Sequence, residues 1–187
     1  LFKFSAIDRI KTPPTVYQAR GTTAHLALER MFELPAPERT PEHLYDLFRE
    51  AWQEIKPTDY HDLFDDVEAE RAWGIESLTI LANYFAIEDP TSFEPLSLEL
   101  DMTQAVGDMT IRGILDRMEE TPEGLVITDY KTGKAPPERY AMPAFFALKI
   151  YALLIRIREG RTPVALRLMY LNGPTVLEIP VNDAQLD

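Results

Sequence analysis

Two acidic residues and a lysine, Asp116, Asp129 and Lys131, lie in a segment whose pattern predicts a β-hairpin. The predicted strands cover residues 110–118 and 125–131, and the polar connection EETPEG between them contains turn-forming proline and glycine. With the turn centred in this connection, Asp116 lies close to opposite Asp129, and the strand period of two places Lys131 on the face of Asp129. The sequence therefore predicts two carboxylates and an ammonium group in one cluster.

Two neighbouring carboxylates repel one another and lose solvation, so a folded protein keeps them together only where a proton or a cation compensates. A divalent cation is the simplest compensator, and ligation by oxygen atoms suits Mg²⁺ or Mn²⁺. The competing interpretation is a solvated hairpin with ordinary surface charges. Against it, apolar residues occupy both faces of the two strands, as in interior strands covered on each side: Ile114, Leu115, Leu125, Val126 and Ile127.

The motifs GILDR and ITDYKTGK in this hairpin resemble the RecB-like branch of the PD-(D/E)XK nuclease superfamily, whose signature is an Asp on one strand and a D/E-x-K on the next. The spacing also matches, because Asp129 lies 13 positions after Asp116. The resemblance implies a metal-dependent DNA nuclease that uses Asp116, Asp129 and the main-chain carbonyl of Tyr130 as metal ligands. It also implies that Lys131 positions or deprotonates the attacking water, and we expect the metal and burial to lower the pKa of Lys131.

A helix is predicted over residues 21–34, with Thr22 or Thr23 as its N-cap and His25 in its first turn. A lone histidine near a helix start is more often a polar core or surface residue than a metal ligand. However, GTTAHLALE resembles the G-x-x-x-H-x-x-x-E helix that precedes the catalytic hairpin in RecB-like nucleases, which implies that His25 contributes to the metal site. Glu29 lies one turn later on the same face, where it can orient His25 or pair with a neighbouring arginine.

Another helix is predicted over residues 143–158, with Gly160 as its stop. The RecB-like family carries a Q-x-x-x-Y motif on this helix, and Tyr151 matches its tyrosine, which implies a catalytic role for Tyr151. Ala147 stands where the family has glutamine. This departure leaves three explanations open: a slower enzyme, a polar group recruited from elsewhere, or a decayed or engineered site. Tyr151 can equally be a core aromatic residue with its hydroxyl at the surface.

Two more helices are predicted over residues 40–55, with Thr40 as the N-cap, and over residues 67–87. Between them, residues 56–66 are rich in aspartate, but they lack the glycine and closing glutamate of a calcium-binding EF-hand loop. We interpret them as a solvated acidic loop. Together the two helices are expected to form an insertion beside the sheet over about residues 40–88.

A strand is predicted over residues 95–102, where leucine and methionine alternate with polar residues. Glu99 and Asp101 are expected on its solvent face, and a turn at residues 104–108 is expected to lead into the catalytic hairpin. Because the RecB-like core often has a glutamate on this strand, the resemblance makes Glu99 a further candidate near the metal.

A last pair of strands is predicted over residues 164–171 and 176–180. Strands and helices in this order indicate an α/β fold, and the resemblance implies a restriction-endonuclease-like core, with a mixed central β-sheet flanked by helices and a helical insertion. The length of 187 residues fits a single nuclease domain over residues 1–187. The chain begins with Leu rather than Met, so we expect it to be part of a longer protein. Residues 1–20 contain a Pro-Pro pair and are expected to be extended.

The composition limits the classes of function. The chain has 19 basic and 31 acidic residues and a formal net charge of −12, so no overall positive field favours nucleic acid. The absence of cysteine excludes disulfides and a cysteine-ligated iron–sulfur cluster within this sequence. No apolar run reaches the roughly 18 residues of a membrane span, and no signal peptide is recognisable. We therefore expect a cytoplasmic protein that does not bind membranes.

The leading hypothesis is a DNA exonuclease that uses Mg²⁺ or Mn²⁺ on single strands or duplex ends in recombination or repair, beside a helicase subunit or domain. An alternative is a catalytically weak or inactive nuclease-like module that binds DNA or a partner, which Ala147 and the acidic composition favour. A third is an enzyme acting on RNA or on another phosphate.

Overall fold

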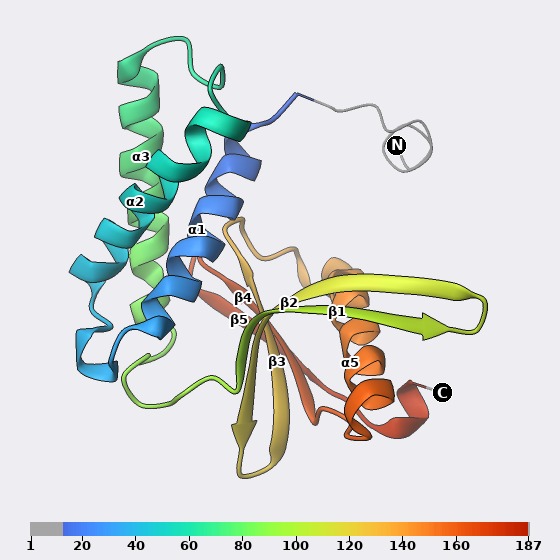
Figure 1. Cartoon of the computed structure of the whole chain (residues 1–187). Helices are drawn as coiled ribbons and strands as arrows, with labels where there is room; N and C mark the ends of the chain where they lie inside the picture. The colour runs from blue at the N-terminus through green and yellow to red at the C-terminus, as the bar shows by residue number, and fades with distance from the viewer. Residues whose placement is uncertain (1–12, 187) are drawn as a thin grey trace.

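The computed structural model describes residues 13–186, and its central feature is a five-stranded sheet with helices on both faces (Figure 1). The strand order is β1-β2-β3-β4-β5. β3 and β4 pair in parallel and every other neighbouring pair is antiparallel, which confirms the predicted α/β class with a mixed sheet. The strands are β1 Ser97–Val106, β2 Met109–Thr121, β3 Gly124–Lys131, β4 Ala165–Tyr170 and β5 Thr175–Pro180.

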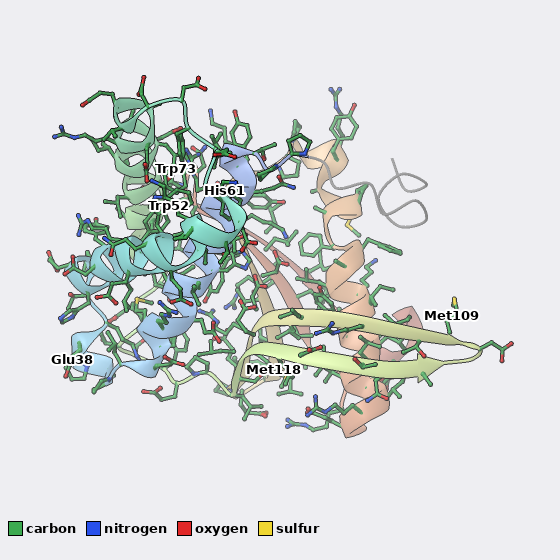
Figure 2. The ribbon with its side chains drawn as sticks, turned by 45° about the horizontal axis from the view of Figure 1, so that its top comes forward. Glu38, Trp52, His61, Trp73, Met109 and Met118 are labelled. Carbon is green, nitrogen blue, oxygen red and sulfur yellow. The ribbon has the colours of Figure 1, made fainter. Side chains whose placement is uncertain are left out.

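The helices α1, α2 and α3 cover one face of the sheet (Figure 1). Their bounds are α1 Val16–Glu33, α2 Pro41–Asp59 and α3 Val67–Ala82. They share an apolar core that includes Trp52 from α2 and Trp73 from α3, whose ring centroids lie 4.5 Å apart (Figure 2). α2 and α3 lie within the predicted insertion, and the predicted N-cap Thr40 accepts a hydrogen bond from the backbone N–H of His43.

α1 begins earlier than predicted. Thr15, rather than Thr22 or Thr23, is its N-cap, and Thr15 and Gln18 form a reciprocal capping box that satisfies two free backbone N–H groups. Residues 16–20, predicted to be extended, are therefore helical. The predicted extended segment also includes residues 1–12, which lie outside the described part of the chain. Residues 13–15 form no helix or strand.

The opposite face of the sheet is covered by α5 Phe146–Glu159, which follows the short helix α4 Ala141–Ala144. The sequence predicts one helix that begins at Pro143, but the structure has two helices here, and Pro143 lies in α4. α5 ends as predicted, because Gly160 adopts the left-handed conformation, with φ 69°, that favours glycine. Short 3-10 helices occur at Ala36–Glu38, Asn83–Ala86, Glu138–Tyr140 and Asp183–Gln185. None of the helices within residues 13–186 is both long and apolar enough to cross a membrane.

The β1–β2 hairpin bends sharply in its middle, and its outer half forms an arm that crosses α5 and has Met109 at its tip (Figures 1 and 2). Leu98 packs in the core under α1–α3, whereas Leu100 packs in the core under α5, although the strand period of two would place both on one face. Glu99 lies between them with φ 41°, a conformation that is uncommon outside glycine. The register on either side places Asp116 across from Glu99, so both residues lie at the bend.

Two details of β1 and β2 differ from the prediction. β1 continues through the expected turn at residues 104–108, and only Gly107 and Asp108 separate it from β2. Gly107 permits this tight connection because it adopts φ 59°. Asp101 is exposed as expected, but Glu99 is not on the solvent face, because the bend turns it towards α1.

Candidate metal centre

His25 of α1 lies against the bend of the β1–β2 hairpin and against Tyr130 of β3. Its Nε2 lies 2.9 Å from the main-chain carbonyl oxygen of Tyr130, and its Nδ1 lies 3.4 Å from Asp116 Oδ1 and 3.8 Å from Glu99 Oε1. When Nε2 carries the proton, it donates to the Tyr130 carbonyl and leaves the Nδ1 lone pair facing the carboxylates. A histidine that binds a metal through one ring nitrogen typically donates the other ring N–H to such a carbonyl or carboxylate.

Asp116 and Asp129 are both buried, with 8% and 7% of their surface exposed. One oxygen of Asp116, Oδ2, accepts a hydrogen bond of 2.7 Å from the Tyr130 N–H, which leaves Oδ1 facing His25. Asp129 Oδ2 has no hydrogen-bond partner within the described residues, although the Lys131 ammonium lies 2.6 Å away in an ion pair. The two carboxylates therefore retain oxygen atoms with unused coordinating capacity.

The donor set fits a divalent cation. The ligand atoms of His25, Glu99 and Asp116 all lie within 4.8 Å of one another, so one ion can contact all three. The set combines one imidazole nitrogen with carboxylate oxygens, and the charge of Asp129, whose Oδ2 is ion-paired with Lys131, also acts on His25 and Glu99. Carboxylate-rich sites of this kind suit Mg²⁺ or Mn²⁺. The Tyr130 carbonyl, which the resemblance implies as a ligand, accepts the His25 hydrogen bond here, and its role as a ligand stays a prediction.

The electrostatics of the site show a shortage of positive charge. Burial lowers the pKa of His25, but the hydrogen bond and charge of Asp116, with the charges of Glu99 and Asp129, raise it to about 9. Burial and the charge of Asp116 raise the pKa of Glu99 to about 7. The pKa of Asp129 is also raised, first by burial and then by Asp116. In the protein without metal, a proton on His25 therefore offsets part of the negative charge of these carboxylates, and a bound cation can take its place.

Lys131 has a raised pKa in the protein without metal, whereas the expected lowering concerned the site with a bound metal. Burial does lower the pKa of Lys131, but the charge and hydrogen bond of Asp129 outweigh burial, so the pKa is raised. Without metal, Lys131 is therefore an ammonium ion that partners Asp129. A positive side chain is suited to contact a phosphate or to orient a water molecule, and not to remove a proton.

Tyr151 reaches the site from α5. Its ring packs against Gly113 of β2 so closely that a Cβ atom added to Gly113 would lie 2.3 Å from Tyr151 Cε1. Burial and the charges of Asp129 and Asp116 raise the pKa of the Tyr151 hydroxyl. The structure thus brings Tyr151 beside the two carboxylates. Ala147, one turn earlier on α5, is exposed and adds no polar side chain.

Glu99 is a candidate ligand that sequence patterns place on the wrong face of β1. The only sequence signal for it is the family glutamate on this strand, because alternation of polar and apolar residues cannot reveal a bend. Glu29 does not contact His25 through a hydrogen bond, and instead it lines a hollow of about 530 Å³ together with His25 and Glu99. Burial and the charge of Glu33 raise the pKa of Glu29. Within residues 13–186, Glu29 therefore forms neither a hydrogen bond with His25 nor an ion pair with an arginine.

Arg117 supports the site from the α1–α3 face. Its side chain is fully buried, forms an ion pair with Glu88, and donates a hydrogen bond of 2.8 Å to the Tyr130 hydroxyl. Tyr130 in turn offers its N–H to Asp116 and its carbonyl to His25. Through Tyr130, Arg117 thus fixes the part of β3 that forms hydrogen bonds with Asp116 and His25.

Comparisons with known proteins agree with this geometry. A family model described as the PD-(D/E)XK nuclease superfamily matches residues 1–185. Among solved structures, an exonuclease candidate from Eubacterium rectale is 16% identical with a TM-score of 0.56, over 96% of this chain and 64% of that one. Protein VC1899 from Vibrio cholerae is 18% identical over 91% of this chain and 48% of that one, and its TM-score of 0.31 is too low to inform the fold. The comparison with curated proteins finds no match.

The Eubacterium rectale structure agrees with the predicted restriction-endonuclease-like core, a mixed sheet flanked by helices. This chain spans 64% of the length of that protein. At 16% identity the likeness concerns the fold alone.

Proposed function

Because this chain belongs to the PD-(D/E)XK nuclease superfamily, we propose that it is a deoxyribonuclease that holds Mg²⁺ or Mn²⁺ between His25, Glu99 and Asp116, with Asp129 as a further predicted ligand. The observation that carries the proposal is that side chains from an early helix and from later strands converge on one candidate metal site. A purely structural cluster has no need for carboxylates placed so that burial and the charge of Asp116 raise the pKa of both Glu99 and Asp129, since such repulsion destabilises the fold.

Each side chain has a distinct task in this proposal. When bound, the cation neutralises charge on the scissile phosphate and activates water. The His25–Tyr130 hydrogen bond fixes the imidazole tautomer, and the Tyr130 N–H fixes the carboxylate of Asp116. Lys131, held beside Asp129, places a positive charge where the phosphate and the attacking water meet. Tyr151 lines the α5 side of the same space.

We propose further that the enzyme is of the RecB-like type and acts as an exonuclease on single strands or duplex ends in DNA recombination or repair, beside a helicase subunit or domain. The DYKTG motif and the early histidine helix support the RecB-like type. The description of the Eubacterium rectale protein as an exonuclease candidate is consistent with exonuclease activity.

A catalytically weak module that binds DNA without cutting it is the second candidate. The exposed Ala147, in the place of the family glutamine, favours this alternative. Against it, His25, Asp116, Asp129 and Lys131 lie together, and a binding module has no chemical use for that set.

The test is a cleavage assay with end-labelled single-stranded DNA, duplex DNA and RNA in Mg²⁺, Mn²⁺ or EDTA. We expect cleavage of DNA that EDTA abolishes. Lys131→Ala should reduce the rate by about 10²- to 10⁴-fold, the range for loss of a catalytic side chain. Asp116→Asn should also abolish binding of Mn²⁺ in calorimetry, whereas Asp101→Asn, on the exposed arm, should change neither. Cleavage that survives Asp116→Asn would reject this site.

A further inference from the structure

Charge is distributed unevenly in this acidic chain. Residues 131–158 contain six basic residues and one acidic residue, whereas residues 13–96 contain six basic and seventeen acidic residues. The basic segment starts at Lys131 of the candidate metal centre and continues through α4 and α5. A polyanion that approaches the site is therefore attracted from the α5 side and repelled from the α1–α3 side.

Large apolar side chains are exposed within the same segment. Tyr140 is 55% exposed, Met142 54% and Phe146 70%, all within seven consecutive positions. The Arg139 guanidinium lies 4.8 Å from the centroid of the Tyr140 ring, in a cation–π contact that keeps this ring beside a positive charge. Exposed aromatic residues interleaved with basic ones indicate a surface that binds more than phosphate alone.

We call this surface the aromatic rim and define it as Lys134, Arg139, Tyr140, Phe146 and Lys149. It is close to the site residues along the chain. Lys134 follows Lys131 by three positions, and the loop after β3 leads to the N-terminal end of α5 (Figure 1). α5 then carries Tyr151 into the site. The two ends of the rim, Lys134 and Lys149, therefore lie three positions from Lys131 and two positions from Tyr151 in the sequence.

We infer that the aromatic rim binds an unpaired nucleic-acid strand and guides its end into the metal centre. This inference rests on the proposed nuclease function and deepens it by naming the surface that binds the unpaired strand. Unpaired bases have free faces that can stack on Tyr140 and Phe146, while lysine and arginine contact the phosphates between them. A duplex buries its base faces in its own stack, so it can use only the charges.

The inference is tested by fluorescence anisotropy with a labelled 20-nucleotide single strand and a blunt duplex of the same sequence. The chain is used in EDTA, where cleavage lacks its metal. The double variant Tyr140→Ala, Phe146→Ala should weaken single-strand binding at least tenfold, because stacking on one aromatic residue accounts for about 5- to 150-fold in affinity. Duplex binding should change less than threefold. Tyr17→Ala, at an equally exposed aromatic residue on α1, is the matched control.

A second variant separates charge from stacking. Lys134→Gln, Arg139→Gln should weaken single strand and duplex alike and should flatten the dependence of affinity on salt. Single-strand binding that is unchanged in the Tyr140→Ala, Phe146→Ala variant would overturn the inference, as would equal losses for single strand and duplex. If the chain binds the single strand as expected but never cleaves DNA in Mg²⁺ or Mn²⁺, only the nuclease function is rejected. Failure of the inference and failure of the proposed function are therefore distinguishable.

Discussion

The two faces of the sheet differ in charge, in packing and in what they bring to the candidate site. The α1–α3 face is acidic, carries a continuous aromatic core and contributes His25. The α5 face is basic at its surface, contributes Tyr151 and is crossed by the β1–β2 arm. Asp116, Asp129 and Glu99 lie where the two meet.

This difference teaches that holding a cation and holding a polyanion are separate tasks in this protein. A cluster of carboxylates attracts a metal ion but repels DNA, so the positive charges that attract DNA must approach from another side. The bend at Glu99 makes this possible, because it lets one hairpin serve both faces. The two faces should therefore respond differently to mutation.

The largest expected effect on stability concerns the α1–α3 face. Arg117→Ala removes a fully buried guanidinium and leaves Glu88 and the Tyr130 hydroxyl without their partner. Breaking a buried ion pair typically costs about 3–5 kcal/mol, and we expect a decrease of this size in the free energy of unfolding from urea titration. Arg112→Ala, on the exposed arm, removes an ion pair with Asp101 and should leave stability nearly unchanged. Equal losses in the two variants would contradict the contrast between the faces.

A smaller effect is expected where the arm meets α5. Gly113→Ala places a methyl group against the Tyr151 ring, and overpacking of this kind typically costs about 1–3 kcal/mol. Because the Tyr151 ring must move, nuclease activity should fall while binding of Mn²⁺ persists. Gly74→Ala is the matched control on α3, where an added Cβ meets nothing within 4 Å and alanine favours the helix. A variant Gly113→Ala with native activity would exclude a role for the position of Tyr151.

The smallest effect concerns the pH dependence of stability at the junction of the two faces. The pKa of Glu99 rises from 4.5 to about 7 on folding, and that of His25 from 6.5 to about 9. Each raised pKa stabilises the folded state fully below the unfolded value, and this contribution is lost as the pH rises through the folded value. In EDTA, the melting temperature should therefore decrease between pH 5 and pH 9.

Differential scanning fluorimetry measures this decrease. Glu99→Gln should flatten the part between pH 5 and pH 7, while Glu50→Gln, at an exposed position of α2, should follow the parent curve. Mg²⁺ should raise the melting temperature more at pH 9 than at pH 6, because fewer protons then compete for the ligands. A melting temperature in EDTA that is independent of pH would show that the cluster is not formed as described.

Much of the site could be predicted from local patterns. Apolar residues on both faces and the turn-forming connection EETPEG located the strands that carry Asp116 and Asp129, and the family motifs related them to His25, 91 positions before Asp116. The start of α1 was wrong because two capping signals compete there, and the Thr15–Gln18 pair forms both of its hydrogen bonds. The lowered pKa expected for Lys131 beside a bound metal stays a prediction, since without metal Asp129 outweighs burial and raises this pKa.

The amino-acid order alone determined the α/β class, the strands of the hairpin and the residue types at the site, because side-chain periodicity and turn chemistry act over a few neighbouring positions. Only the tertiary structure decided that Glu99 faces His25, since a single backbone dihedral at the bend reverses which side of β1 is buried. It also decided that the Tyr151 ring packs against Gly113. No local pattern encodes this contact, because it joins a helix to a strand 38 positions away in the sequence.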